Sequence, residues 1–129
     1  MMSILGAAHA VEDRIETALS AEGLSMAKLG VLRVLVGAPQ PISLGEVAKR
    51  LACVRSNVTQ LVDRLEADGL VRRQPGPNDR RSITAVITPE GRTRHEAGAR
   101  VMESLQADVS QSLANFGADQ IDQAMKSIT

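Results

Sequence analysis

Four arginines flank a short polar segment in the middle of the chain, in the sequence RRQPGPNDRRS from Arg72 to Ser82. The prolines, the glycine and the Asn-Asp pair favour a tight turn and exclude a helix. The segment is also too polar for a core, so it is expected on the surface. Its far end carries Arg80 and Arg81, whose guanidinium groups suit phosphate or a narrow, A·T-rich minor groove of DNA.

A second group of polar side chains precedes this segment, in the sequence RSNVTQLVDRLEADGL that starts at Arg55. Its apolar residues have the i, i+3, i+4, i+7 spacing of one buried helix face: Val58, Leu61, Val62 and Leu65. The opposite face then presents Ser, Asn, Gln and Arg, which are side chains that read base edges in a major groove. They are concentrated in the first two turns, the part of a recognition helix that reaches bases. The candidate DNA-binding residues of this helix are Arg55, Ser56, Asn57, Thr59, Gln60 and Arg64.

The composition is that of an ordinary globular chain, with 129 residues, 43% hydrophobic and 23% charged. This length is enough for one domain with its own core. Phe116 is the single aromatic residue, so the core has to be built from aliphatic side chains and methionine, which favours helix packing. The formal net charge is zero, yet the stretch from Leu44 to Arg94 holds ten Lys/Arg and six Asp/Glu. This local positive charge favours a polyanionic partner.

Few residues are suited to a metal, a cofactor or catalysis. Cys53 is the single cysteine, which excludes an intramolecular disulfide, and we expect it to be a small buried apolar side chain. His9 and His95 have no acidic or thiol partners at ligand spacing. Because glycine-rich phosphate loops and nucleophile–histidine sets are also missing, we predict no metal, no cofactor and no enzyme.

The sequence also predicts a cytoplasmic protein. It has no run of about 18 apolar residues that would span a membrane. At its N-terminus, no basic region leads into an apolar run, which a secretion signal would need.

The elements around the two polar groups predict a helix-turn-helix. Ser43 and Glu46 have the spacing of a capping box, with Ile42 and Val47 as its hydrophobic staple, so a helix is expected from Leu44 to about Ala52. A short turn leads to the second helix, and Val54 or Arg55 stands where a polar cap is usual. Gly69 followed by Leu70 is typical of a glycine stop. Two short helices joined by a tight turn have the layout of a helix-turn-helix.

Two β-prone stretches, Leu70–Gln74 and Ser82–Thr88, flank the arginine-rich turn and predict a hairpin. We call this hairpin and its turn the wing. Because side chains alternate along a strand, Arg72 and Arg73 must point to opposite faces. At most one of them therefore faces DNA, and the alternation alone does not say which.

Helices are expected on both sides of this module. Ser3–Leu19 is amphipathic, and Met26–Val36 is apolar nearly all round, as in a buried helix. Thr88 can cap a long helix that starts at Pro89, with Gly117 ending it and a last short helix over Ala118–Ser127. The long helix repeats apolar residues down one face: Val101, Leu105, Val109, Leu113 and Phe116.

The predicted fold is mainly α with a small β-hairpin wing. It is a single domain over 1–129, with a winged helix-turn-helix core at 26–88. The terminal helices, 3–22 and 89–129, carry apolar faces that the small core cannot cover. Burial against a second copy is the simplest solution, and twofold dimers are the commonest oligomers. We therefore predict a homodimer and, for DNA, a pseudo-palindromic operator.

The most specific part of the sequence, DGLVRR followed by NDRR and ITPEG, resembles the MarR family of bacterial transcriptional regulators. The resemblance covers roughly Leu29 to Arg94. It implies that Arg81 enters the minor groove while Asp79 braces its guanidinium, and we expect Arg80 to follow phosphate. It also implies a dimer joined through the terminal helices.

The resemblance further implies a small-molecule or redox effector that changes DNA affinity. The peroxide-sensing members carry their reactive cysteine in the first helix, where this chain has none. An apolar cleft beside the second helix is a possible effector site, lined by Met26, Leu29 and Arg33, although plain core packing is the simpler explanation of these side chains.

Two functions remain open from the sequence. The first is a homodimeric, sequence-specific DNA-binding regulator, most simply a repressor that blocks promoters. The second is a winged-helix protein-interaction module without DNA binding, which the zero net charge and Asp63 on the reading face would favour.

Overall fold

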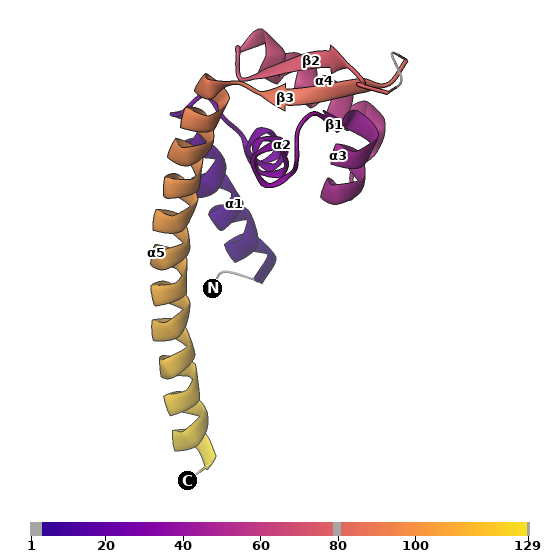
Figure 1. Ribbon diagram of the computed structural model, residues 1–129. Helices are drawn as coiled ribbons and strands as arrows, with labels where there is room; N and C mark the ends of the chain where they lie inside the picture. Colours follow the sequence, from indigo (N-terminus) through magenta and orange to yellow (C-terminus); the bar gives the residue numbers. More distant parts are fainter. Residues whose placement is uncertain (1–3, 79–80, 129) are drawn as a thin grey trace.

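A computed structural model describes residues 4–78 and 81–128, and the side chains of these except 4, 5, 7, 112, 113 and 115–128. The chain forms five helices and three strands within these residues, and Figure 1 shows their arrangement. In chain order they are α1 (Ile4–Ser20), α2 (Met26–Gly37), β1 (Ile42–Ser43), α3 (Leu44–Leu51), α4 (Arg55–Ala67), β2 (Val71–Pro75), β3 (Ile83–Ile87) and α5 (Pro89–Ile128). This is the predicted winged helix-turn-helix, with α3 and α4 as its two helices.

The sheet has three antiparallel strands in the order β1-β3-β2. The predicted hairpin is confirmed, with Arg73 opposite Ala85 and Pro75 opposite Ile83. β1 was not predicted from the sequence, and in it Ile42 pairs with Ala85 and Ser43 with Thr84. A strand of two residues is too short to show an alternation of apolar and polar side chains in the sequence. It forms because it pairs with β3. β2 is left as the edge strand beside α4.

The core lies where α2, α3 and α4 meet the sheet, and the described part of it is aliphatic. Its fully buried large residues come from every helix except α5 and from the start of the hairpin: Leu19, Leu32, Leu35, Leu44, Leu65, Leu70, Val31, Val47, Val58, Val62 and Val71. Helix α2 occupies the centre, in keeping with its apolar sequence (Figure 1). Within the part of the chain that the structure describes, no helix combines the length and apolar character of a membrane span.

Three predicted helix boundaries are confirmed by local hydrogen bonds or backbone angles. The Ser43 hydroxyl accepts a bond from the Glu46 amide at 3.1 Å at the start of α3. Gly69, with φ +78°, follows α4, and the Leu70 amide donates back to the Leu65 carbonyl at 2.9 Å. The Thr88 hydroxyl accepts from the Gly91 amide at 2.9 Å where α5 begins at Pro89.

The prediction that Gly117 ends the long helix is wrong, because α5 continues without a break from Pro89 to Ile128. The expected short helix over Ala118–Ser127 is its last part. Glycine inside a helix costs only about 1 kcal/mol relative to alanine, so without a second signal such as proline it does not end one. Helix α5 therefore extends well past the end of α1 (Figure 1).

The turn between α3 and α4 places an alanine in a left-handed conformation. Ala52 has φ +53° and ψ +40°, and it is the one non-glycine residue with positive φ among the described residues. Its amide hydrogen-bonds to the Lys49 carbonyl at 3.2 Å, so the turn geometry is tied to the helix end. An L-residue pays about 1–2 kcal/mol in this region, whereas glycine does not.

We therefore expect Ala52→Gly to raise the free energy of unfolding by about 0.5–1 kcal/mol, after the larger entropy of the unfolded glycine chain is subtracted. Urea denaturation followed by circular dichroism measures this as a higher midpoint with an unchanged slope. A lower midpoint would show that the turn is not strained at Ala52.

Candidate nucleic-acid interface

Helix α4 buries one face and exposes the other, as its sequence predicts. Val58, Val62 and Leu65 are fully buried in the core. Five of the six candidate residues of this helix are exposed: Arg55, Ser56, Asn57, Gln60 and Arg64. They form a polar surface along the first three turns, which we call the reading face.

The start of α4 lacks a side-chain cap. Val54 is the N-cap residue, with φ −72° and ψ 142°, and no side-chain hydrogen bond is made at this position. Val54 is 65% exposed. Because no side chain of the cap bonds to the first amides of α4, amides at this helix end can donate hydrogen bonds to a phosphate oxygen.

Thr59, the sixth candidate, is less exposed than the other five. It is half-buried, and its hydroxyl donates a hydrogen bond to the Arg55 carbonyl at 3.0 Å within the helix. Its own carbonyl accepts a bond from Arg73 at 3.1 Å. Thr59 therefore belongs to the side of α4 that contacts β2.

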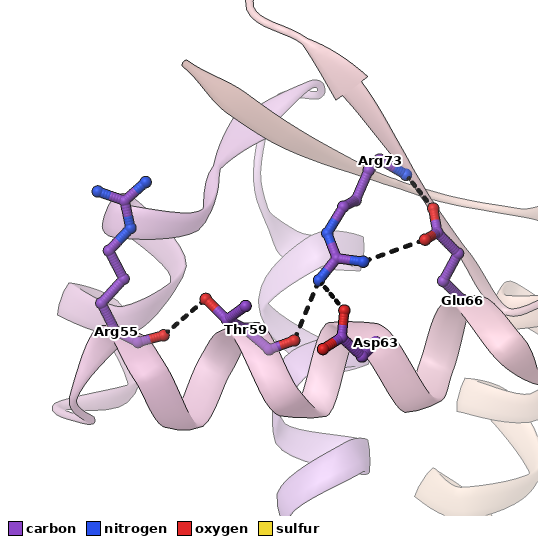
Figure 2. A network of polar contacts seen from close by, with 5 residues as sticks. All are labelled: Arg55, Thr59, Asp63, Glu66 and Arg73. Carbon is purple, nitrogen blue, oxygen red and sulfur yellow. Dashed lines mark hydrogen bonds and ion pairs between the residues drawn. The ribbon is translucent and has the colours of Figure 1, made fainter. Parts of the chain in front are cut away.

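Arg73 lies between the hairpin and α4, and Figure 2 shows its contacts. Its guanidinium donates to Glu66 at 3.1 Å, forms an ion pair with Asp63, and caps the Thr59 carbonyl. Its backbone amide donates to the second oxygen of Glu66 at 2.8 Å. The Arg73 side chain is only 22% exposed.

These contacts show which of the two arginines points to α4. Arg73 points to α4, and Arg72 is exposed on the other face of the hairpin. The negative charge of Asp63, which weighed against DNA, is paired with Arg73.

The wing projects from the core on the side away from α5 (Figure 1). The Gly76 amide donates to the Ser82 carbonyl at 2.7 Å, which closes the hairpin across its turn. Arg81 is exposed in this turn. Asp79 and Arg80 lie outside the described residues, so the brace between Asp79 and Arg81 stays a prediction.

The three candidate effector residues line one groove of about 350 Å³ between α2 and α5. Met26 and Arg33 are exposed, and Leu29 packs partly against the core. The α5 side of the groove was not predicted from the sequence: His95, Ala99, Met102, Glu103 and Gln106. His95, Ala99, Met102 and Gln106 recur at intervals of three or four residues, so the helical period of α5 was the available signal.

Cys53 is exposed, and the expectation that it is buried is wrong. It directly follows Ala52, the left-handed residue of the inter-helix turn, and its sulfur lies 3.5 Å from the Leu51 carbonyl oxygen. Among the described residues, no group of three or more His, Cys, Asp or Glu side chains is placed to hold a metal.

The sequence matches a model of the MarR family over residues 22–82. It is 35% identical over 96 residues to the HTH-type transcriptional regulator PecS of Dickeya dadantii, covering 70% of this chain and 58% of PecS. It is 29% identical over 113 residues to the HTH-type transcriptional repressor YetL of Bacillus subtilis, covering 87% of this chain and 66% of YetL. The chain spans about half to two thirds of the length of the curated relatives that it matches first.

Solved structures share the fold over nearly the whole chain. The transcriptional regulator BldR from Sulfolobus solfataricus has a TM-score of 0.74 at 27% identity, covering 92% of this chain and 88% of BldR. The transcriptional repressor CouR bound to a 23-mer DNA duplex has a TM-score of 0.78 at 24% identity, covering 95% and 86%. CouR from Rhodococcus jostii RHA1 has also been solved with p-coumaroyl-CoA.

Proposed function

Because the chain belongs to the MarR family, we propose that it is a homodimeric transcriptional regulator that binds a specific DNA sequence, most simply as a repressor. The observation that carries this proposal is the reading face of α4, whose exposed side chains are of the types that recognise base edges. The exposed Arg81 in the wing beside it supports the proposal as a second contact.

In this proposal α4 enters the major groove with its N-terminal turns. Gln60 is suited to a bidentate contact with adenine, and Arg64 to guanine or to phosphate. Arg55, Ser56 and Asn57 lie near the uncapped helix start and contact bases or phosphates there. Thr59 plays a smaller part, since its hydroxyl already donates to the Arg55 carbonyl.

The wing supplies the second contact of each subunit. We assign Arg81 to the minor groove, with Asp79 bracing its guanidinium and Arg80 following the phosphates. Arg73 is excluded from a direct role by its contacts with α4.

The terminal helices support the homodimer. A largely apolar groove runs between α1 and α5, lined by Val11, Ile15, Met102, Leu105 and Val109 with two polar neighbours. The last part of α5 extends past α1 (Figure 1). Burial of these faces against a second copy would give a twofold dimer, whose two reading faces fit half-sites about one helical turn apart.

The groove between α2 and α5 is our candidate effector site. Met26, Leu29 and Met102 offer apolar contacts, and Arg33 offers a charge at the rim. These residues suit a small, largely apolar compound with an anionic group. A ligand that bridges α2 and α5 would change the position of the DNA-binding module relative to the terminal helices.

The experiment that tests the function is selection of duplexes from random DNA, followed by fluorescence anisotropy at several salt concentrations. We expect selected duplexes to contain an inverted repeat and to bind at least about 1,000-fold more tightly than random duplexes. Equal affinity for selected and random DNA would contradict sequence-specific binding and restore the protein-interaction module as the better explanation.

Replacement of Gln60 by alanine should relax the base preference at one position of each half-site. Loss of one bidentate base contact costs about 1–3 kcal/mol against the preferred base and leaves binding to random DNA nearly unchanged. Affinities for a panel of single-base variants of the selected duplex measure this. Equal losses on selected and random duplexes would instead show that Gln60 contacts the backbone.

A further inference from the structure

The contacts of Arg73 join two elements that, in the proposed function, touch different grooves of DNA. Helix α4 carries the reading face, and the hairpin carries Arg81. Arg73 is on β2, yet its guanidinium contacts α4 at three places one turn apart: Thr59, Asp63 and Glu66 (Figure 2). A planar guanidinium with several acceptors is held in one orientation, which a single ion pair between flexible side chains does not achieve.

The backbone of the edge strand takes part in the same contact. β2 has β3 on one side only, so alternate amides of β2 point away from the sheet. Glu66 accepts both from the Arg73 amide, at 2.8 Å, and from its guanidinium, at 3.1 Å. This carboxylate thus fixes the main chain of the hairpin as well as the side chain.

The other edge of the hairpin is supported by β1, which pairs with β3. β1 pairs only with Thr84 and Ala85, and the turn beyond Ile83 extends past it. Ala85 is the residue opposite Arg73, so the α4 contact and the β1 contact hold the hairpin at the same level. The angle between the outer half of the hairpin and α4 therefore depends on the contacts made at Arg73 and Ala85.

We propose that Arg73 is a positioning residue that sets the angle of the wing against α4, so that the reading face and Arg81 can occupy neighbouring grooves together. This inference rests on the proposed function, because it concerns how two DNA contacts are kept in register. Arg73 contributes to affinity through Arg81 and makes no contact with DNA itself.

The test uses Arg73→Lys and the matched control Arg72→Lys in the full chain. Both changes keep the charge, but lysine has no planar fork and cannot reach all the acceptors of Arg73. On a selected duplex we expect Arg73→Lys to weaken binding about five- to tenfold and Arg72→Lys to change it less than about twofold. The slope of log Kd against log salt should stay the same for Arg72→Lys and become shallower for Arg73→Lys, because a displaced wing loses the phosphate contact assigned to Arg80.

A double-mutant cycle with Arg81→Ala identifies the route of the effect. If Arg73 acts through the wing, Arg73→Lys should cost less than about twofold once Arg81 is absent, because coupled residues are not additive. Equal losses from Arg73→Lys with and without Arg81 would overturn the proposal in favour of a direct contact.

A second variant protects the test if Arg73→Lys does not fold, which circular dichroism would reveal. Glu66→Ala removes a negative charge close to the reading face, so electrostatics alone predicts tighter binding to DNA. The positioning role predicts weaker binding, because the amide and guanidinium of Arg73 both lose their acceptor. Tighter binding by Glu66→Ala would overturn the proposal.

Failure of the proposed function is recognised separately. In that case the unchanged protein itself shows no preference for selected DNA, whereas failure of the positioning role appears only in the variants.

Discussion

Replacement of Gly91 by alanine is expected to lower the free energy of unfolding by about 2–4 kcal/mol, a larger stability effect than that of any other substitution considered for this chain. A Cβ atom at this position would lie 2.1 Å from the Leu70 carbonyl oxygen and 2.7 Å from Cγ1 of Ile87. The oxygen belongs to the main chain and cannot rotate away. It also accepts a hydrogen bond from the Thr88 amide at 3.0 Å, so its position is fixed by the start of α5. Relief of the clash would require the first turn of α5 to move off the hairpin.

Urea denaturation at one fixed protein concentration measures this loss, because the stability of the proposed dimer would depend on concentration. Gly45→Ala is the matched control: it is also a helical glycine, and no atom lies within 4 Å of its added Cβ. We expect Gly45→Ala to leave stability unchanged or to raise it by up to about 1 kcal/mol. If both variants unfold at the same urea concentration, α5 is not packed closely on Leu70.

Local signals predicted the fold well because each one is complete within a few residues. The caps at Ser43, Gly69 and Thr88 each involve partners that lie within about one turn of helix. The close approach at Gly91 was not predicted, since it depends on the Leu70 carbonyl. This carbonyl is far from Gly91 in the sequence and comes close to it only when the hairpin forms. The same reason explains β1, which exists because β3 pairs with it.

The prediction that a glycine ends a helix was right at Gly69 and wrong at Gly117. Gly69 ends α4 because the chain turns there with a positive φ, whereas Gly117 lies within α5. Both positions come after an amphipathic helical stretch, so composition does not separate them. The residues on the C-terminal side of each glycine make the difference. Leu70 enters the core directly after Gly69, whereas α5 continues without a break past Gly117.

The sequence predicted part of the candidate interface correctly and left part of it undetermined. Helical periodicity identified the buried and exposed sides of α4 correctly, since burial follows directly from a period of 3.6 residues. Strand alternation established that Arg72 and Arg73 differ, but not which one meets α4. That choice is made by the packing of β2 against the side of α4 that carries Asp63 and Glu66. Cys53 was placed wrongly because residue type alone says little about an inter-helix turn.

Replacement of Arg81 by alanine is expected to weaken binding to the selected duplex by about ten- to a hundredfold at about 150 mM salt, the largest effect on affinity that we predict. The fold and the proposed dimer should be retained, since Arg81 is exposed in the turn of the wing and lies outside the core. A charged hydrogen-bond donor in a narrow minor groove contributes about 1.5–3 kcal/mol, which accounts for the expected loss.

Arg92→Ala is the matched control for charge, because Arg92 is an exposed arginine in the first turns of α5, at the opposite end of the hairpin from the wing turn (Figure 1). It should weaken binding less than about threefold by loss of long-range attraction alone.

A second duplex, with the A·T pairs flanking each half-site changed to G·C, tests whether the wing binds the minor groove. The unchanged protein and Arg92→Ala should lose affinity on this duplex, whereas Arg81→Ala should not distinguish it from the first. An Arg81→Ala variant that still prefers A·T flanks would show that the wing does not read the minor groove, and recognition would then rest on α4 alone.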